Sequence, residues 1–399
     1  MNRKKVVLAF SGGLDTTFCL LHFIEEGFDV ITVIVDSGGF SKEELNEIEK
    51  RALFLGAKKH FNVDAKDQIY DNIVSYIIKF NALYQGDYPL MCTDRYIIAK
   101  EVAKIAEDQG AKYVAHGSTA NGNDQIRFDS AFFCVAPQLT VLCPIKYLNI
   151  SREEEIAFLD KKNIDFDKSN RRYSINENIF GLTFSGSEID EGKEVKNSIF
   201  KLSKVDKSIQ KDDFNYIKLQ FKGGLPIAIN DKKSNGLTIL SKLNKIVGRY
   251  GYGRGLYVGD CIIGIKGRIA FEAPGVLALI KAHKKLSQYV LTKQQIEFHS
   301  ISSGIWSDLA YSGLYYEPLA RDLEVFCNST QKNVSGMVKL KVSLNKLEVV
   351  EIDSKNSLID SSVATYAQSG SWSAEQADGF IKLYTMQQRI SSIGKRLKN

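Results

Sequence analysis

The sequence predicts an α/β protein: a parallel-sheet domain, then an α+β domain and a C-terminal helical tail. Short apolar runs alternate with helical patterns up to about residue 165, which is typical of β-α-β units. Beyond that point, Gly-rich turns separate shorter β-like runs and helices. A length of 399 residues also favours two or three domains over one. We therefore place the domains at 1–165, 166–362 and 363–399.

The first domain is predicted to contain five strands that alternate with helices. The apolar runs that predict strands lie at 6–10, 30–35, 59–63, 112–116 and 141–144. Helical patterns lie at 16–26, 41–56, 66–80, 94–109 and from 151 onward. Ser41 and Ser151 each begin a capping box, with a glutamate three residues later. Parallel sheets of this kind bind ligands at the carboxyl ends of their strands.

The second domain begins with a polar connection at 188–213 and then mixes strands with helices. We expect strands at 216–221, 225–229 and 256–265, and helices at 239–248, 275–289 and 318–330. Alternating apolar residues predict a hairpin from 338–344 and 347–351, turning at Asn345. The tail at 379–397 carries regularly spaced apolar residues and a basic end, which is compatible with docking on another subunit.

The charge does not favour nucleic acid as a partner. The chain has 53 Lys and Arg against 47 Asp and Glu, a net charge of +6. Residues 1–165 carry a net −5 and residues 166–399 a net +11. The six cysteines form no C-x-x-C pair, so neither a zinc site nor a disulfide framework is predicted. No apolar stretch is long enough for a membrane span, and we expect a soluble cytoplasmic protein.

The segment 11–16, Ser-Gly-Gly-Leu-Asp-Thr, stands where the first strand turns into the first helix. Two glycines let the backbone approach an anion closely, and the helix N-terminus favours negative charge. The segment is not a Walker A loop, because no Gly-Lys-Ser/Thr follows, and it lacks the third glycine of a dinucleotide fingerprint. A plain turn after a strand is the alternative; a phosphate cradle is the hypothesis we favour.

Longer segments around this loop resemble a known family. Residues 7–17 and 110–128 are similar to the argininosuccinate synthases, which belong to the N-type ATP pyrophosphatases. Residues 173–178, 264–268 and 330–336 match the same family, so the resemblance covers nearly the whole chain. It implies a nucleotide-binding first domain of the ATP pyrophosphatase type, a synthetase second domain and a homotetramer that uses the C-terminal helix.

The resemblance also implies a ligation in two steps, with ATP as a substrate and Mg²⁺ as its cofactor. The ureido oxygen of citrulline attacks the α-phosphorus of ATP and releases pyrophosphate, and the amine of aspartate then displaces AMP. By resemblance, the nucleotide contacts are Ala9, Phe10, Ser11, Gly12, Gly13, Leu14, Asp15, Thr16, Thr17, Val35 and Gly117. Asp15 is also the expected Mg²⁺ ligand and one of three catalytic candidates, with Asp124 and Arg127.

The two amino-acid substrates have separate expected contacts. Thr119, Asn123 and Asp124 match the aspartate-binding positions of the family. The Asp124 carboxylate can orient the substrate's ammonium group or accept its proton, and the sequence leaves both roles open. Positions that match or conservatively replace citrulline contacts are Tyr88, Thr93, Asn123, Arg127, Ser174, Thr183, Asp260 and Phe271.

Departures from the family pattern gather at the citrulline positions. A family glutamate aligns with Gly259, and Asp260 is the nearest carboxylate in sequence. A family tyrosine is replaced by Phe271, and the segment 92–96 is one residue shorter than its family counterpart and lacks a proline. Two alternatives therefore stay open: a ligase for another ureido acceptor, and an ATP-sensing protein without catalysis. A sulfur- or ammonia-transferring enzyme is disfavoured, because the paired cysteines and glutaminase nucleophile of such enzymes are absent.

Overall fold

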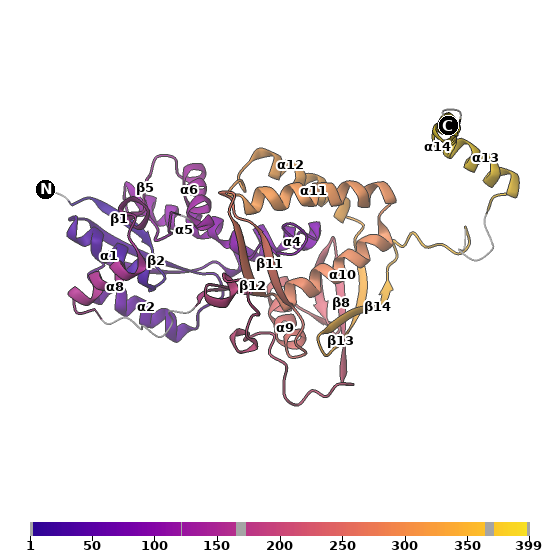
Figure 1. Ribbon diagram of the computed structural model, residues 1–399. Helices are drawn as coiled ribbons and strands as arrows, with labels where there is room; N and C mark the ends of the chain where they lie inside the picture. The colour runs from indigo at the N-terminus through magenta and orange to yellow at the C-terminus, as the bar shows by residue number, and fades with distance from the viewer. Residues whose placement is uncertain (1–2, 121, 165–172, 364–370, 397–399) are drawn as a thin grey trace. The chain divides into compact units, whose positions relative to one another are not determined.

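The computed structural model describes residues 3–120, 122–164, 173–363 and 371–396. These residues form two compact units, one from 1 to 356 and one from 357 to 399 (Figure 1). The domain boundary predicted at residue 165 falls in the segment 165–172, outside the described residues.

The first part of the larger unit is built on a five-stranded parallel sheet, as the alternating pattern predicts. The strand order is β3-β2-β1-β4-β5, and every neighbouring pair runs parallel. Its strands are β1 (Lys5–Ala9), β2 (Asp29–Asp36), β3 (Lys59–Asp64), β4 (Tyr113–Ala115) and β5 (Thr140–Leu142). With β1 central, the loops after β1, β2 and β4 lie at the same edge of the sheet.

Helices bury both faces of this sheet. On β1, Val6 and Leu8 point into one hydrophobic core with helix α1, while Val7 points into the other with α5. The helices of this part are α1 (Leu14–Glu25), α2 (Lys42–Phe54), α3 (Lys66–Ile69), α4 (Ser75–Phe80), α5 (Asp94–Asp108), α6 (Asn123–Val135), α7 (Pro144–Leu148) and α8 (Arg152–Lys161). The capping boxes at Ser41 and Ser151 are confirmed.

This part differs from the sequence prediction in several places, one of which is the short helix α7, where no helix was predicted. The expected helix at 66–80 is present, but its middle, η1 (Tyr70–Val74), is a π-helical turn between α3 and α4. Helix α6 occupies a segment for which no helix was predicted. A polar first turn, with Asn123, Asp124 and Gln125, hides its helical pattern. A further 3₁₀ turn, η2 (Met91–Thr93), precedes α5.

The remainder of the larger unit holds two antiparallel sheets, in line with the predicted α+β domain. One sheet has the order β10-β9-β8-β13-β14 and the other β11-β12-β7-β6. The strands are β6 (Ser174–Asn178), β7 (Gly181–Ser185), β8 (Phe214–Lys222), β9 (Leu225–Ile229), β10 (Lys232–Lys233), β11 (Arg254–Asp260), β12 (Lys266–Glu272), β13 (Gly336–Ser343) and β14 (Lys346–Asp353). The hairpin at Asn345 is confirmed, with a positive φ of 57° at the turn.

The helices of this second part are α9 (Gly236–Gly248), α10 (Pro274–Val290), α11 (Lys293–Tyr311) and α12 (Pro318–Gln331). The polar connection at 188–213 contains only the short turns η4 (Ser187–Ile189) and η5 (Asn197–Ile199). The elements that were not predicted are the β6–β7 hairpin, strands β10 and β12, and helix α11. The predicted run 256–265 is in fact β11 followed by a turn into β12.

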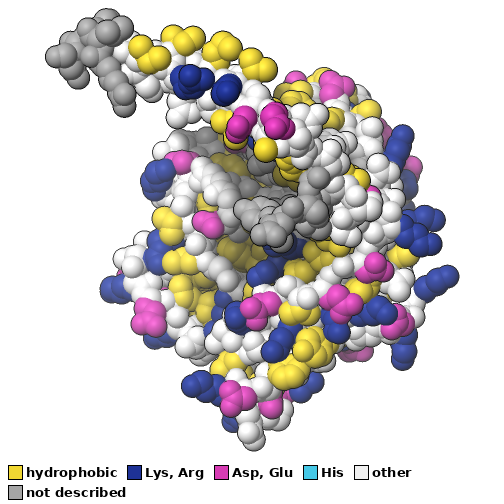
Figure 2. All heavy atoms as spheres, turned by 90° about the vertical axis from the view of Figure 1, so that its right-hand side faces the viewer, with side chains coloured by type: hydrophobic (Ala, Val, Ile, Leu, Met, Phe, Trp, Pro, Cys, Tyr) yellow, Lys and Arg dark blue, Asp and Glu magenta, His cyan; other side chains and the backbone are white. Residues whose placement is uncertain are grey.

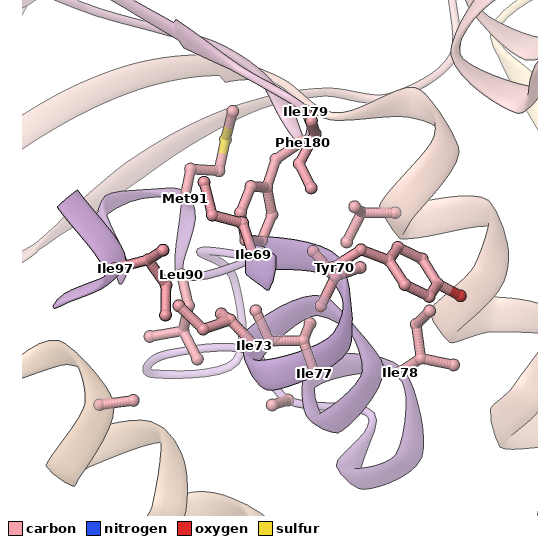
Figure 3. Close-up of a cluster of buried hydrophobic side chains, with 14 of the residues drawn as sticks. Ile69, Tyr70, Ile73, Ile77, Ile78, Leu90, Met91, Ile97, Ile179 and Phe180 are labelled. Atoms are coloured by element: carbon pink, nitrogen blue, oxygen red, sulfur yellow. The ribbon is translucent and has the colours of Figure 1, made fainter. Parts of the chain in front are cut away.

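One hydrophobic cluster joins the two parts of the larger unit (Figure 3). Ile69, Ile73 and Ile77 project from the 66–80 helix towards Leu90, Met91 and Ile97. Ile179 and Phe180, at the turn of the β6–β7 hairpin, lie over the same helix. All these side chains are at most 8% exposed. The first part, with its parallel sheet, and the second part of the larger unit therefore share one core.

In the smaller unit, the tail that was predicted to be helical forms α13 (Ala374–Tyr384) and α14 (Met386–Arg396). Figure 2 shows hydrophobic side chains in a row along this segment. The exposed apolar residues on it are Phe380, Ile381, Leu383, Tyr384, Met386, Ile390 and Ile393. Among the described residues, no helix combines the length and the hydropathy that crossing a membrane requires.

Candidate active site

The loop between β1 and α1 has the backbone geometry of an anion cradle. Gly12 has a φ of +75°, and a Cβ atom there would lie 3.2 Å from Cγ1 of Ile48. The amide of Gly13 donates to the Ser11 hydroxyl (3.3 Å), which also contacts the Thr16 hydroxyl at 3.3 Å. Ser11 is exposed and Thr16 is half-buried, so the loop is open to a ligand at the start of α1.

Gly117 brings the loop after β4 against this cradle. A Cβ on Gly117 would lie 3.2 Å from the backbone carbon of Asp15 and from Cγ2 of Thr16. The preceding residue, His116, is fixed on both ring nitrogens: Ser118 N–H donates to Nδ1 at 3.2 Å, and Nε2 contacts Asp129 at 2.8 Å. The structure thus brings together the two segments that the sequence assigned to the nucleotide.

Asp15 faces a second carboxyl group that the sequence analysis missed. Its side chain lies next to that of Glu155, a buried residue in the first turn of α8. Burial, together with the adjacent Asp15 carboxylate, raises the pKa of Glu155 to about 8. Burial also raises the pKa of Asp15 above its usual value. Burial and the neighbouring carboxyl group thus favour the neutral form of Glu155, and once both groups are deprotonated they offer the hard oxygen ligands that Mg²⁺ prefers.

Asp124 is the centre of an ion cluster at the start of α6. Its Oδ1 accepts from Nη1 of Arg127 at 2.8 Å, and its Oδ2 accepts from Nε of Arg95 at 3.0 Å. Burial would raise the pKa of Asp124, but the two guanidinium groups outweigh it and lower this pKa below its usual value. A carboxylate held in its ionised form is a weak proton acceptor. The geometry therefore favours an orienting role for Asp124 over that of a base.

Arg95 extends this cluster into the second part of the chain. Its Nη1 donates to Asp94 at 2.7 Å and its Nη2 to Asn176 on β6 at 2.9 Å. Asp94 in turn accepts from Asn178 at 2.9 Å. Arg95 belongs to the segment 92–96, which departs from the family pattern, so the sequence analysis did not assign it a role. Its position beside an aspartate at the start of a helix was the signal.

Asn123 and Thr119 lie beside the Asp124 cluster. The Asn123 amide donates to the Tyr311 hydroxyl (3.2 Å) and accepts from the backbone N–H of Ile262 (2.9 Å). Thr119 is exposed in the turn before α6, where Gly122 N–H donates to its carbonyl at 3.2 Å. Both residues are thus close to Asp124 in the fold, as the predicted aspartate site requires.

Several predicted acceptor positions share one face of the β11-β12-β7-β6 sheet. Thr183 pairs with Phe271 on one side and with Asn176 on the other. Phe271 packs edge-on against Tyr88, with ring centroids 5.7 Å apart. Ser174 lies on the same face one row away, opposite Ser185, and is exposed. The hydrogen bond from Arg95 to Asn176 ties this face to the Asp124 cluster.

Other predicted positions do not present their side chains to a ligand. Thr17 and Thr93 are fully buried, and the Thr93 hydroxyl donates to the Leu90 carbonyl at 2.7 Å. Tyr88 is 2% exposed, and the side chains of Phe10 and Val35 are also buried, which leaves their backbone as the possible contact. Asp260 is partly exposed, but Lys266 holds one carboxylate oxygen at 2.5 Å.

Two family models together match most of the chain. The model described as "Arginosuccinate synthase N-terminal HUP domain" matches residues 5–165, and the "Arginosuccinate synthase C-terminal domain" matches residues 173–391. An argininosuccinate synthase of Xanthomonas campestris pv. campestris is 40% identical over 390 residues, 97% of this chain and 98% of that protein. One from Methanocaldococcus jannaschii is 37% identical over 396 residues, 98% of this chain and 99% of that protein.

Proposed function

This chain belongs to the argininosuccinate synthase family, and we propose that its site residues divide between the three substrates of that reaction. The protein is an ATP-dependent ligase that joins citrulline and aspartate to form argininosuccinate, AMP and pyrophosphate. The ureido oxygen of citrulline attacks the α-phosphorus, and pyrophosphate leaves. The amine of aspartate then attacks the activated ureido carbon, and AMP leaves with the former ureido oxygen.

ATP is assigned to the cradle at 11–16 and to Gly117. The exposed amides and hydroxyl groups of the cradle stabilise the charge that develops on the departing pyrophosphate, with the N-terminus of α1 behind them. Asp15 and Glu155 together would hold Mg²⁺, as their two oxygen-donor groups fit this ion. When bound, Mg²⁺ neutralises phosphate charge.

Aspartate is assigned to Thr119, Asn123 and Asp124, where the ionised Asp124 orients the incoming ammonium group. Citrulline is assigned to Arg127 and to the sheet face that carries Thr183, Phe271 and Ser174. Nε and Nη1 of Arg127 are bound to the Tyr311 carbonyl (2.9 Å) and to Asp124, which leaves Nη2 for the substrate carboxylate. The remaining candidates, Tyr88, Thr93 and Asp260, shape this site from behind its surface or from its rim.

The observation that carries this assignment is the continuity of the segment 117–127. It packs Gly117 against the cradle and then delivers Asp124 and Arg127 to the ion cluster. One short segment therefore spans the nucleotide position and both amino-acid positions. This continuity matches a reaction in which the acceptor is first adenylylated and then attacked by aspartate.

The test is a substrate-omission assay with the purified chain. We expect AMP and pyrophosphate to form with Mg-ATP, aspartate and citrulline, and argininosuccinate to form only when all three are present. If calorimetry shows ATP binding but no ureido compound leads to pyrophosphate release, the protein is an ATP sensor and not a ligase.

The smaller unit supports self-association, and we propose the homotetramer of the family. Seven large apolar side chains of α13 and α14 are at least 47% exposed, an arrangement that stable helices avoid unless a partner covers them. Light scattering should give a tetramer for the full chain and a smaller species for a chain ending at Asn356. An unchanged mass after this truncation would exclude the tail as the assembly element.

A further inference from the structure

Beyond Arg127, the acceptor site is bounded by a wall of four tyrosines, Tyr84, Tyr88, Tyr257 and Tyr311. Tyr84 and Tyr311 are stacked with ring centroids 3.7 Å apart, and Tyr257 lies 5.6 Å from Tyr88. None of the four is more than 7% exposed. The tyrosine wall is therefore a rigid, closely packed surface with fixed positions for its hydroxyl groups.

The space next to Gly259 is filled by two uncharged polar groups of this wall. A Cβ atom on Gly259 would lie 2.1 Å from the Tyr257 hydroxyl and 2.4 Å from Oε1 of Gln85. The Tyr257 hydroxyl donates to that same Oε1 at 3.0 Å. The Tyr257 phenol and the Gln85 amide, which are hydrogen-bonded to each other, thus occupy the volume that any side chain at position 259 would need.

The two carboxylates next to Gln85 and Arg127 are already paired with cations, and a third, the exposed Asp308 of α11, acts on the Tyr84 end of the wall. Asp260 contacts Lys266 through Oδ1 at 2.5 Å and accepts from Nε2 of Gln85 through Oδ2 at 3.2 Å. These two contacts lower the pKa of Asp260 below its usual value. Asp124 is paired with Arg95 and Arg127 and is already assigned to the ammonium group of aspartate. Neither carboxylate is left over to balance a cationic group of the acceptor.

The aromatic rings offer no substitute for a carboxylate. The Arg127 guanidinium already lies over the Tyr311 ring, 4.7 Å from its centroid, and Tyr84 covers another part of that ring. A second cation at this face would be repelled by Arg127. An ammonium group here would lose its water shell without gaining a counter-charge.

We propose that this acceptor site reads the ureido group and the carboxylate of its substrate but not the α-ammonium group. It therefore accepts ureido acids in which the α-amine is absent or acylated, as well as citrulline. Gln85 and Tyr257, together with the absence of a side chain at Gly259, are its specificity determinants. The inference rests on the proposed function, because it concerns the acceptor of the same reaction.

The first experiment compares acceptors with the full chain. At saturating Mg-ATP and aspartate, kcat/KM for AMP formation is measured with citrulline, with Nα-acetylcitrulline and with δ-ureidovalerate, which is citrulline without its α-amine. A site that pairs a substrate's polar group rejects the analogue lacking it by about 10,000-fold. Here we expect δ-ureidovalerate to fall within about 100-fold of citrulline; a larger preference for citrulline overturns the inference.

The second experiment adds a negative charge to the wall. The Gln85→Glu variant keeps an oxygen for the Tyr257 hydroxyl and adds a carboxylate next to Gly259. We expect the preference for citrulline over δ-ureidovalerate to rise by about tenfold or more, while KM for ATP stays unchanged. The matched control is Gln294→Glu on the exposed side of α11, which adds the same charge and should leave the ratio unchanged.

The possible outcomes distinguish a failure of the proposed function from a failure of the inference about the acceptor. If no acceptor, citrulline included, supports AMP formation, the proposed function fails. If citrulline is used and Gln85→Glu folds but leaves the ratio unchanged, the assignment of Gln85 fails and the proposed function stands. If Gln85→Glu does not fold, the comparison of acceptors on the unaltered chain still decides the inference.

Discussion

The nucleotide cradle and the tyrosine wall are built in opposite ways. In the cradle, glycines remove side chains so that backbone groups and a helix terminus can face an anion. At the wall, Gly259 also lacks a side chain, but Tyr257 of the same strand and Gln85 from a distant segment fill the space it leaves. A missing side chain therefore exposes the backbone in the cradle, whereas at the wall it makes room for the side chains of Gln85 and Tyr257.

This difference determines how each region should respond to substitution. The neighbours of Gly117 include the backbone of α1, which cannot move without shifting the helix. The neighbours of Gly259 are the ends of two side chains, and one of them, Gln85, is flexible. Changes at the cradle should therefore act on ATP, and changes at the wall should act on the acceptor alone.

The largest effect is expected where the two regions meet, at Asp124. The Asp124→Asn variant leaves two guanidinium groups with a weakened partner, so we expect the free energy of unfolding to fall by about 2 kcal/mol. Aspartate-dependent AMP release should fall with it. Urea denaturation measures the stability, and the control is Asp206→Asn, whose ion pair with Arg249 is screened by water and should contribute little.

The stability difference at Asp124 should also depend on pH in one direction. The folded state lowers this pKa below the usual carboxyl value of 3.8, so the stabilisation is complete well above that value. It is lost as the pH falls through the lowered pKa. Unfolding curves of the unaltered chain and of Asp124→Asn should therefore converge in acid, and a constant gap would show that ionisation of Asp124 contributes nothing.

A smaller effect is expected at the cradle. The Gly117→Ala variant places a methyl group 3.2 Å from the backbone of Asp15, so the loop must shift by a few tenths of an ångström. We expect kcat/KM for ATP to fall by about tenfold, or about 1.4 kcal/mol of transition-state stabilisation. The control is Gly304→Ala on α11, where no atom lies within 4 Å of the added carbon.

The smallest effect on ATP is expected at the wall. In Gly259→Ala the methyl group displaces the ends of Gln85 and Tyr257, so kcat/KM for the acceptor should fall while KM for ATP stays within about twofold. Steady-state kinetics with each substrate varied in turn measures both. A loss of ATP affinity as large as that of Gly117→Ala would contradict the distinction between the two regions.

The sequence predicted the parallel sheet well because its evidence is local. Apolar runs, the capping boxes at Ser41 and Ser151 and the glycines at 12 and 13 each act within a few residues of their position. Helix α6 was missed because its polar N-terminal part, which carries Asp124 and Arg127, is shaped by the ion cluster and not by an apolar stripe. The helix follows from contacts that no window of sequence contains.

The same reasoning explains which site residues were found. Asp15 and Asp124 were recognised through their motifs, but the partners that set their ionisation, Glu155 and Arg95, come from other segments. The role of Gln85 depends on a hydrogen bond to Tyr257, far along the chain. Pairings of this kind depend on how separate elements pack, so they cannot be predicted from the spacing of residues along the sequence.

The shared core of Figure 3 has a consequence for how the chain can be divided. Ile179 and Phe180 belong to one segment matched by a family model, while Ile69 and Ile73, which they cover, belong to the other. A cut in 165–172 would leave each fragment with a bare apolar surface. The two fragments should therefore be insoluble when expressed singly and should regain activity when co-expressed, assembling as if they were two subunits of one enzyme.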